Sequence, residues 1–238
     1  MSELISVIIP VYNHSRELRK SFNSLLKQTY RPLEVVIVDD GSTDNLAEVL
    51  EQIKILATES KEFSLKFIRQ ANRGAAAARN TGLVQASGEY LIFWDADTVA
   101  EPAMLEKLLL NLQQHPGAAY AYCDYRFGWK KMKSRDFDAE LLKINNYIDT
   151  TALIRRLPGL KFDESLKRFQ DWDLWLTLLE QNKTGSYLPE LLYKKIVGWR
   201  SGISSWRPAF FYRWLPFLPG VRSYRQAQNL VRQKHHLP

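Results

Sequence analysis

The feature that most constrains the fold is an alternation between short apolar segments and segments with helical spacing. Apolar, β-branched and aromatic residues dominate residues 4–11, 33–38, 63–70, 90–94 and 117–127. The segments between them place apolar residues three and four positions apart, as Leu18, Phe22, Leu25 and Leu26 do. Strands that alternate with helices in this way indicate an α/β fold, with a mostly parallel, Rossmann-related sheet covered by helices on both faces.

Polar turns follow four of the predicted strands. They read "YNHS", "DDGS", "QANRG" and "DAD". The carboxyl ends of parallel strands meet at one edge of a sheet, and open α/β sheets bind ligands in the crevice at that edge. We therefore expect these four turns to line a single binding site.

The charge of the chain is unevenly distributed. The formal net charge is +7, yet the first 190 of the 238 residues hold 24 basic and 26 acidic side chains. From Leu191 onward there are nine basic residues and no acidic one. A nearly neutral body argues against a nucleic-acid-binding domain, and the basicity of the C-terminal segment requires a separate explanation.

Cysteine and histidine usage limits the other classes of site. The single cysteine, Cys123, excludes an intrachain disulfide framework and fits a reducing compartment, where it would be a small buried residue. The four histidines lack the ligand spacing of a zinc site. The first ten residues suggest a strand rather than a secretion signal, and no apolar run reaches the ~20 residues that span a bilayer.

The stretch "GEYLIFWDADT" contains the most informative pair of side chains. Asp95 and Asp97 follow a buried strand directly, and residues two apart in an extended segment point the same way. Two adjacent carboxylates repel each other unless a cation lies nearby, and Mg²⁺ or Mn²⁺ prefers oxygen ligands that it shares with substrate phosphates. The alternative is a solvated acidic turn or a helix N-cap; the position at the end of a buried strand favours the metal.

The stretch "VVIVDDGST" indicates a nucleotide contact. Asp40 could accept a hydrogen bond from a base NH or a ribose hydroxyl, while Ser42 or Thr43 caps the following helix. A dinucleotide-binding Rossmann fold is excluded because no G-x-G-x-x-G follows a strand, and a P-loop is excluded because its glycine-lysine motif is missing.

Five motifs in order resemble a known enzyme family. "SVIIPVYNHSREL", "LEVVIVDDGSTD", "NRGAAAARNTGL", "ASGEYLIFWDADT" and "QDWDLWLTLLEQN" span about residues 4–200 and resemble a family-2 glycosyltransferase of GT-A-like fold. The resemblance implies an inverting, metal-dependent transfer of a sugar from a nucleoside diphosphate donor, with a UDP-sugar favoured.

The resemblance also implies roles for individual residues. The nucleotide-sugar contacts would come from the strand ends and the glycine-rich turn, namely Pro10, Val11, Tyr12, Asn13, Asp40, Gly74, Arg79, Asp95 and Ala96. Asp97 and Asp95 would hold the metal, with Asp97 the direct ligand, and Asp171 would be the catalytic base. A helix N-terminus favours the ionised carboxylate that a base requires, although Asp171 or Asp173 could instead cap that helix. Trp172 and Trp175 are more typical of core residues than of aromatic rings that stack on a sugar, although one of them could stack on the acceptor.

Two positions depart from the family pattern. Gln170 stands where the family commonly has Glu before the base. Lys194 takes the place of an Arg near the diphosphate, and "VGWRSG" supplies no histidine, so Trp199 or Arg200 would close over the donor.

The C-terminal segment interleaves aromatic residues with arginines, from Trp199 through Trp206, Phe210 and Trp214 to Tyr224. Prolines limit it to short amphipathic pieces. Three interpretations remain open: an anionic membrane surface, nucleic acid as the second choice, or packing on the body. We expect a catalytic domain at 1–200, with a nucleotide-binding part at 1–125 and an acceptor part at 126–200, and a C-terminal helical extension at 201–238.

The sequence thus predicts a glycosyltransferase of polysaccharide biosynthesis that acts on a glycan or lipid-linked acceptor, in the cytoplasm or at the cytoplasmic membrane face. The alternative from another class is a catalytically silent sugar-nucleotide-binding scaffold or partner subunit. A nucleotidyltransferase is less well supported, because the usual glycine- and lysine-rich phosphate loop near the N-terminus is missing.

Overall fold

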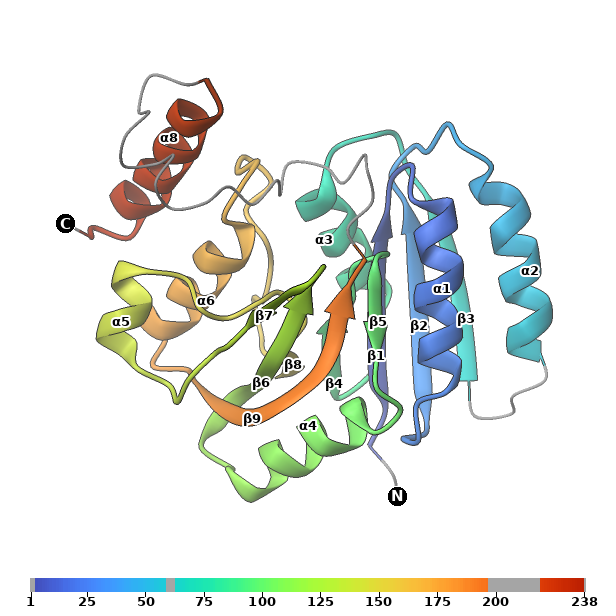
Figure 1. Cartoon of the computed structure of the whole chain (residues 1–238), viewed down its shortest axis with the longest axis horizontal. Helices are drawn as coiled ribbons and strands as arrows, with labels where there is room; N and C mark the ends of the chain where they lie inside the picture. Colours follow the sequence, from blue (N-terminus) through green and yellow to red (C-terminus); the bar gives the residue numbers. More distant parts are fainter. Residues whose placement is uncertain (1–2, 59–62, 197–218, 238) are drawn as a thin grey trace.

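The computed structural model describes residues 3–58, 63–196 and 219–237, and its core is one curled, mixed sheet (Figure 1). The strands are β1 (Ile5–Val11), β2 (Leu33–Asp39), β3 (Phe63–Arg69), β4 (Tyr90–Phe93), β5 (Thr98–Ala100), β6 (Ala118–Phe127), β7 (Lys130–Met132), β8 (Leu153–Arg155) and β9 (Thr184–Lys195). Their order is β3-β2-β1-β4-β8-β6-β9-β5, and β7 pairs with β6 as a hairpin.

The direction of the strands determines where the site lies. The strands β3, β2, β1 and β4 are parallel, β8 runs antiparallel to both β4 and β6, and β9 is parallel to β6. The carboxyl ends of six strands therefore point to one edge of the sheet. The predicted mostly parallel α/β sheet is confirmed, and the polar turns after β1, β2, β3 and β4 share that edge.

Helices cover both faces of the sheet, because alternate side chains of its buried strands face opposite sides. The helices are α1 (Ser15–Leu26), α2 (Leu46–Thr58), α3 (Ala75–Gln85), α4 (Met104–Gln114), α5 (Ala139–Ile144), α6 (Gln170–Glu180) and α8 (Pro219–Lys234). One core cluster joins α1, α2 and α4 to the sheet, and the other joins α3, α5, α6 and α8 to its opposite face. Trp172 and Trp175 lie in the second cluster, as expected of core residues.

The close packing of α3 on the sheet has a clear local cause. Gly82 lies over β1, where an added Cβ would approach the Ile8 side chain to 2.4 Å. The neighbouring alanines of α3, Ala76 and Ala77, are also buried. Small residues on this helix face let α3 approach the sheet and bring Arg79 to the crevice edge.

Several elements were not predicted from the sequence. The strands β5, β7 and β8 and the helix α5 fall in segments without a readable period. The C-terminal helix α8 is present, and Val221 and Val231 are fully buried on it. Trp199, Arg200, Trp206, Phe210 and Trp214 lie outside the described residues. In the described part of the chain, none of the helices has both the length and the apolar character needed to cross a bilayer.

Candidate active site

Two cations hold the first carboxylate of the "DAD" turn. Asp95 Oδ1 lies 2.7 Å from Nη2 of Arg79, and its Oδ2 lies 2.9 Å from Nζ of Lys195. Burial alone would raise the pKa of the Asp95 carboxyl, but the charges of Lys195 and Arg79 outweigh it and hold this pKa well below its usual range. Asp95 is therefore ionised, and both of its oxygens are already paired within the protein.

Lys195 links the turn to a residue that the sequence did not reveal. Its Nζ also lies 2.7 Å from Oδ2 of Asp149, and Tyr193 donates a hydrogen bond of 2.9 Å to Asp149 Oδ1. The prediction placed Lys194 near the diphosphate. Lys194 is exposed and leaves the opposite face of β9 from Lys195, so its contact with the diphosphate stays a prediction.

Asp97 differs from Asp95 in having no ion-pair partner among residues 3–58, 63–196 and 219–237. In the same residues its buried Oδ1 finds no hydrogen-bond partner, while main-chain bonds from Thr98 to Asp95 and from Ile196 to Asp97 hold the turn. Burial first, and then the charge of Asp95, raise the pKa of Asp97 to about 6. An orphaned carboxylate oxygen next to a second carboxylate fits a hard divalent cation, which takes oxygen ligands. With Asp95 already ion-paired, Asp97 is the residue that best fits a metal.

Asp171 lies at the first turn of α6, close to the same group of charges. Asn146 donates a hydrogen bond of 2.8 Å to its Oδ2, and the main-chain NH of Trp172 lies 2.9 Å from its Oδ1. Burial, followed by the charge of Asp149, raises the pKa of Asp171 to about 6. A carboxylate with this pKa is mostly ionised at neutral pH and is a stronger base than an exposed aspartate.

Arg79 joins the two predicted motifs. While Nη2 binds Asp95, Nη1 donates a hydrogen bond of 2.9 Å to Oε1 of Gln170, the residue before Asp171. Gln170 in turn donates to the carbonyl of Leu166 at 2.6 Å. Gln170 departs from the family pattern but can still bind Arg79, because its amide oxygen accepts the hydrogen bond from the guanidinium group.

The formal charges of this group do not cancel. Two cations, Arg79 and Lys195, face four carboxylates: Asp95, Asp97, Asp149 and Asp171. No cluster of three His, Cys, Asp or Glu side chains suited to a metal ion occurs in residues 3–58, 63–196 and 219–237. A divalent ion here would thus depend on Asp97 and on oxygens of a bound diphosphate, as Mg²⁺ usually does.

The loops expected to hold the nucleotide are fastened to each other. Asn13, with φ of 54°, accepts hydrogen bonds at its Oδ1 from the main-chain NH groups of Thr43 and Asp44, at 2.8 and 3.3 Å. Ser42 Oγ accepts from the NH of Asn13 at 3.0 Å, and α2 begins only at Leu46. The expectation that Ser42 or Thr43 caps that helix was wrong, since the hydroxyls of both residues bond to Asn13 in the neighbouring loop instead.

Asp40 is buried and holds the glycine-containing turn after β3. Its Oδ1 accepts from the Gln70 side chain at 2.7 Å and from the NH of Arg73 at 2.9 Å, and its Oδ2 accepts from the NH of Gly74 at 2.8 Å. Gly74 adopts φ of 93° just before α3, a conformation that favours glycine. The structure therefore gives Asp40 a structural role, and its predicted contact with base and ribose stays a prediction.

The remaining predicted contacts lie at the same edge. Pro10 and Val11 end β1, and Tyr12 follows them with 46% of its surface exposed. Ala96 is buried between the two aspartates of the turn. An exposed aromatic ring beside the strand ends is available for stacking on a ligand.

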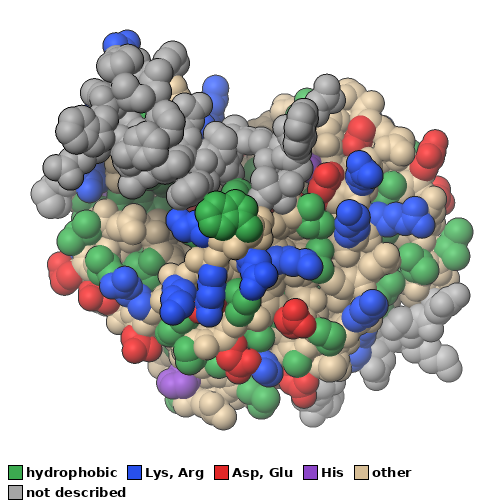
Figure 2. Space-filling model, viewed as in Figure 1, with side chains coloured by type: hydrophobic (Ala, Val, Ile, Leu, Met, Phe, Trp, Pro, Cys, Tyr) green, Lys and Arg blue, Asp and Glu red, His purple; other side chains and the backbone are tan. Residues whose placement is uncertain are grey.

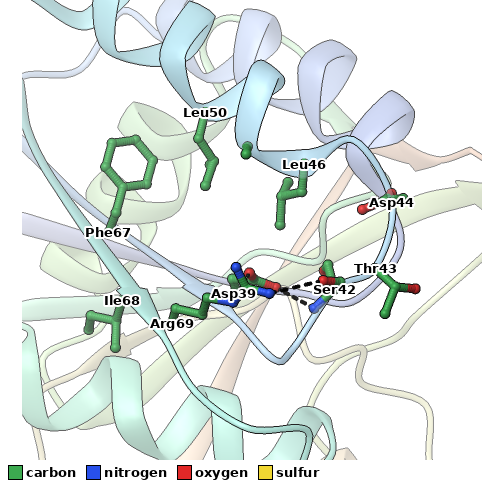
Figure 3. A pocket seen from close by; sticks show the side chains of 10 residues that line it. Asp39, Ser42, Thr43, Asp44, Leu46, Leu50, Phe67, Ile68 and Arg69 are labelled. Carbon is green, nitrogen blue, oxygen red and sulfur yellow. Dashed lines mark hydrogen bonds and ion pairs between the residues drawn. The ribbon is translucent and has the colours of Figure 1, made fainter.

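A pocket of about 510 Å³ lies elsewhere, between α2 and β3 (Figure 3). Leu46, Leu50 and Phe67 line its apolar side, and Asp39 lies at its polar end, where it accepts from the NH of Ser42 at 2.8 Å. None of Asp95, Asp97 and Asp171 lines this pocket. We place the active site at the carboxylate group, because that group carries the uncompensated charge.

The helix α8 contacts the same helix that carries Asp171. Lys234 Nζ lies 2.7 Å from Asp173 Oδ1, and His235 Nε2 lies 2.9 Å from the same oxygen. The other ring nitrogen of His235 lies 2.7 Å from Glu180. Asp173 thus binds the C-terminal helix rather than capping α6, whose N-cap residue is Phe169.

The structure therefore brings Arg79, Asp95, Asp97 and Asp171 together, as predicted. Sequence reasoning missed the contributors that follow no motif, namely Asn146, Asp149 and Lys195. Only Lys195 left a signal in the sequence, since alternation along β9 gives Lys194 and Lys195 opposite faces.

Comparisons with known proteins identify the family of the chain. A family model described as glycosyl transferase family 2 matches residues 6–166 of the chain. An uncharacterized glycosyltransferase of Haemophilus influenzae is 35% identical over 189 residues, which cover 76% of this chain and 73% of that protein. The glycosyltransferase GlyG of Streptococcus pneumoniae is 38% identical over 115 residues, which cover 48% of this chain and 36% of GlyG. The chain thus spans about a third of the length of GlyG.

Two solved structures share the fold. S. aureus TarS 1-349 in complex with UDP-GlcNAc superposes with a TM-score of 0.69 at 24% identity, covering 90% of this chain and 64% of that one. The mannosyltransferase PcManGT from Pyrobaculum calidifontis, in complex with GDP-Man and Mn²⁺, gives a TM-score of 0.68 at 19% identity, with 99% and 71% covered.

Proposed function

The chain belongs to glycosyl transferase family 2, and we propose that it transfers a sugar from a nucleoside diphosphate sugar to a hydroxyl of a glycan or lipid-linked acceptor, with inversion at the anomeric carbon. The complexes of the structural neighbours with UDP-GlcNAc and GDP-Man support a nucleotide-sugar donor, and we favour a UDP-sugar. A place in polysaccharide biosynthesis, in the cytoplasm or at the cytoplasmic membrane face, belongs to the same proposal.

Asp97 is the residue that would hold a Mg²⁺ or Mn²⁺ ion, since its buried oxygen Oδ1 has no hydrogen-bond partner among the described residues. When bound, the ion would neutralise negative charge on the diphosphate as it leaves. Arg79 and Lys195 orient Asp95 beside it, so Asp95 contributes a fixed negative charge at the site rather than a free ligand. The Mn²⁺ in the PcManGT complex supports a metal in this type of site.

Asp171 is the residue that would remove the acceptor proton. Its carboxylate takes the hydrogen of the acceptor hydroxyl as the oxygen forms a bond to the anomeric carbon, and the bond from that carbon to the diphosphate breaks with its electron pair leaving on the diphosphate. With a pKa of about 6, about nine in ten Asp171 side chains are ionised at pH 7. Asn146 orients the carboxylate through its hydrogen bond to Oδ2.

One observation carries the proposal: Arg79 connects the turn of Asp95 and Asp97 to the helix start that bears Asp171. This connection supports the proposal of a metal ligand and a base at one crevice edge. An experiment should therefore measure both binding and chemistry. A panel of nucleotide sugars is screened for thermal stabilisation with Mn²⁺, with Mg²⁺ and with EDTA, because a ligand that binds the folded state raises its apparent stability.

The donor that stabilises best is then assayed for nucleotide release. Metal-dependent release of the nucleoside diphosphate is the expected result. A protein that is stabilised by the donor but releases no nucleotide, with or without acceptors, would instead be a silent sugar-nucleotide-binding scaffold. Absence of any metal-dependent stabilisation would contradict the proposed site itself.

A further inference from the structure

The turn of the β6–β7 hairpin presents a tryptophan to solvent. Gly128, at φ of 57°, and Trp129 connect the two strands. Trp129 is 85% exposed, the most exposed large apolar side chain in the described part of the chain. An indole ring left in water contributes little to folding, although burying it would be strongly favourable. This side chain therefore requires an explanation other than packing.

The hairpin surrounds this tryptophan with cations. Residues 126–135 contain five basic side chains and no acidic one, namely Arg126, Lys130, Lys131, Lys133 and Arg135. Arg126 pairs in register with Lys131 on β7 and with Lys194 on β9, so these three leave the same face of the sheet. Figure 2 shows Lys and Arg side chains gathered in a band across this face, over β6, β7 and β9. Lys130 pairs with Phe127 and therefore leaves the opposite face. We call Trp129, Arg126, Lys131, Lys133, Arg135 and Lys194 the hairpin patch.

Two carboxylates lie next to the patch along the chain, Asp124 on β6 and the exposed Asp136 after Arg135, and the five cations of the patch outnumber them. Asp124 is the nearest carboxylate along β6, and it is buried. It accepts hydrogen bonds from the Tyr187 hydroxyl at 2.6 Å and from the NH of Ser134 at 2.9 Å, and it lies 3.3 Å from Lys131. Its charge is thus directed inward, and like-charged neighbours such as Arg126 and Lys194 repel one another unless an anionic partner lies above them.

The hairpin patch lies at the rim of the proposed active site. Gly128 donates its NH to the carbonyl oxygen of Lys195 at 3.3 Å, and Phe127 pairs with Lys195 in the sheet. The Lys195 side chain binds Asp95 on the other face, above the ring of Tyr125. Trp129 is therefore next to Gly128, whose main-chain bond goes to the carbonyl of Lys195, the residue whose side chain belongs to the site.

We propose that the hairpin patch docks on an anionic lipid bilayer, with Trp129 at the headgroup level and the surrounding cations on lipid phosphates. An amphipathic indole ring beside lysines and arginines is the combination that favours this interface. A single-stranded nucleic acid would need several aromatic rings along a groove, whereas this turn presents one. Docking would turn the crevice edge toward the membrane. In that orientation the site would face a lipid-linked acceptor, which is the part of this inference that rests on the proposed function. Binding of the patch to the membrane does not depend on activity.

Co-sedimentation of the full chain with vesicles tests the proposal. We expect binding to phosphatidylcholine vesicles that contain about 30% phosphatidylglycerol and weak binding to phosphatidylcholine alone, because the attraction depends on anionic lipid. Trp129→Ala and the triple variant Arg126→Gln, Lys133→Gln and Arg135→Gln should each weaken binding at least about tenfold. Higher salt should weaken binding of the unaltered chain, since the cations are exposed.

Two matched controls make the result specific. Arg16→Gln, Arg19→Gln and Lys20→Gln remove the same charge from exposed positions of α1, and Val84→Ala removes an apolar group that is 80% exposed on α3. Both should bind vesicles as the unaltered chain does. Equal loss in the charge control would show a general charge effect and overturn the proposal.

Two further outcomes separate the possibilities. If vesicles do not bind but a single-stranded oligonucleotide does, and the hairpin variants lose it, the patch is a nucleic-acid surface and the proposal is wrong. If vesicle binding depends on the hairpin in a chain that shows no donor hydrolysis, docking stands while the proposed function fails. Donor hydrolysis without acceptor should be unchanged in Trp129→Ala, which shows that the variant is folded.

Discussion

The two halves of the sheet hold their functional residues in different ways. In the half formed by β3, β2, β1 and β4, which we propose binds the donor, polar residues follow strand ends, as Asp40 does, and Asp40 is held by the turn that ends at Gly74. In the half formed by β8, β6, β9, α6 and α8, which we propose binds the acceptor, charges are held by partners from segments without a readable pattern, as Asp173 is held by Lys234 and His235. The contacts of both halves form only on folding, but the polar residues of the donor half lie at strand ends that the local pattern predicts.

The largest effect is expected in the donor half, at Asp97. Asp97→Asn keeps the shape of the side chain and removes its charge, so kcat should fall about 10⁴-fold, which is about 5 kcal/mol of barrier. Because Asp97 Oδ1 has no hydrogen-bond partner in the part of the chain that the structure describes, the same change should raise the free energy of unfolding by about 1 kcal/mol. Steady-state kinetics and chemical denaturation measure the two effects. Glu89→Gln, an exposed carboxylate before β4, is the control; activity retained in Asp97→Asn would remove this residue from the site.

The second effect tests whether the acceptor half contains the base. Asp171→Asn should lower kcat about 10³-fold, which lies within the usual contribution of a general base. Donor affinity should stay unchanged, because Asp171 contacts Asn146 and α6 rather than the donor loops. Isothermal titration with the donor and single-turnover kinetics separate these quantities. Loss of donor binding in Asp171→Asn would mean that Asp171 contributes to donor binding, which contradicts its proposed role as the base in the acceptor half.

The donor half also contains a buried charge with a purely structural role. Glu34 on β2 accepts hydrogen bonds from Ser87 at 2.7 Å and Lys66 at 2.7 Å, and from the Ser6 hydroxyl. Burial alone would raise the pKa of Glu34, but the hydrogen bonds from Lys66, Ser6 and Ser87 outweigh it and lower this pKa to about 2. Glu34→Gln should cost about 2 kcal/mol of unfolding free energy, since an amide cannot accept from all of these donors.

The pH dependence of this loss has a definite sign. A carboxyl with a lowered pKa stabilises the fold above its ordinary value of 4.5, and the gain disappears as pH falls toward 2. The difference in unfolding free energy between Glu34→Gln and the unaltered chain should therefore be constant near pH 7 and shrink below about pH 4. Denaturation at several pH values measures it, with Glu51→Gln on the exposed face of α2 as the control. A difference that grows as the solution becomes more acidic would contradict the assigned role.

A smaller effect concerns the pH profile of the acceptor half. Because a base must be ionised, and the pKa of Asp171 is raised to about 6, kcat should fall about tenfold between pH 7 and pH 5. In Asp171→Asn the residual rate should not follow this profile when the metal is saturating, because a bound cation keeps Asp97 ionised. A profile that is flat through pH 6 in the unaltered chain would show that another group controls the rate.

How much of this was predictable differs between the halves for a physical reason. The strands and turns from Ile5 to Asp97 follow from hydrophobic period and turn chemistry, which are local properties. Arg79, Asp95 and Asp97 were predicted for the same reason. Asn146 and Asp149 were not, because they lie in an irregular segment where only tertiary contacts position a side chain, and Lys195 depended on which face of β9 turns inward.

The smallest expected effect, at His235, tests how far α8 controls the acceptor half. His235 is buried between Asp173 and Glu180; burial lowers the pKa of this histidine, but the two carboxylates outweigh it and raise the pKa above its ordinary value of 6.5. A raised histidine pKa stabilises the fold below pH 6.5, and the gain is lost as pH rises through the folded value. His235→Ala should therefore cost about 1 kcal/mol of unfolding free energy at pH 6 and less at pH 9.

Because Asp173 shares the first turn of α6 with Asp171, kcat of His235→Ala should fall a few-fold while the KM for the donor is unchanged. Gln233→Ala, an exposed change on the same helix, should alter neither quantity. If His235→Ala lowered stability and left kcat unchanged, α8 would stabilise the fold without positioning the base. The C-terminal contacts of the acceptor half would then have a purely structural role, as Glu34 has in the donor half.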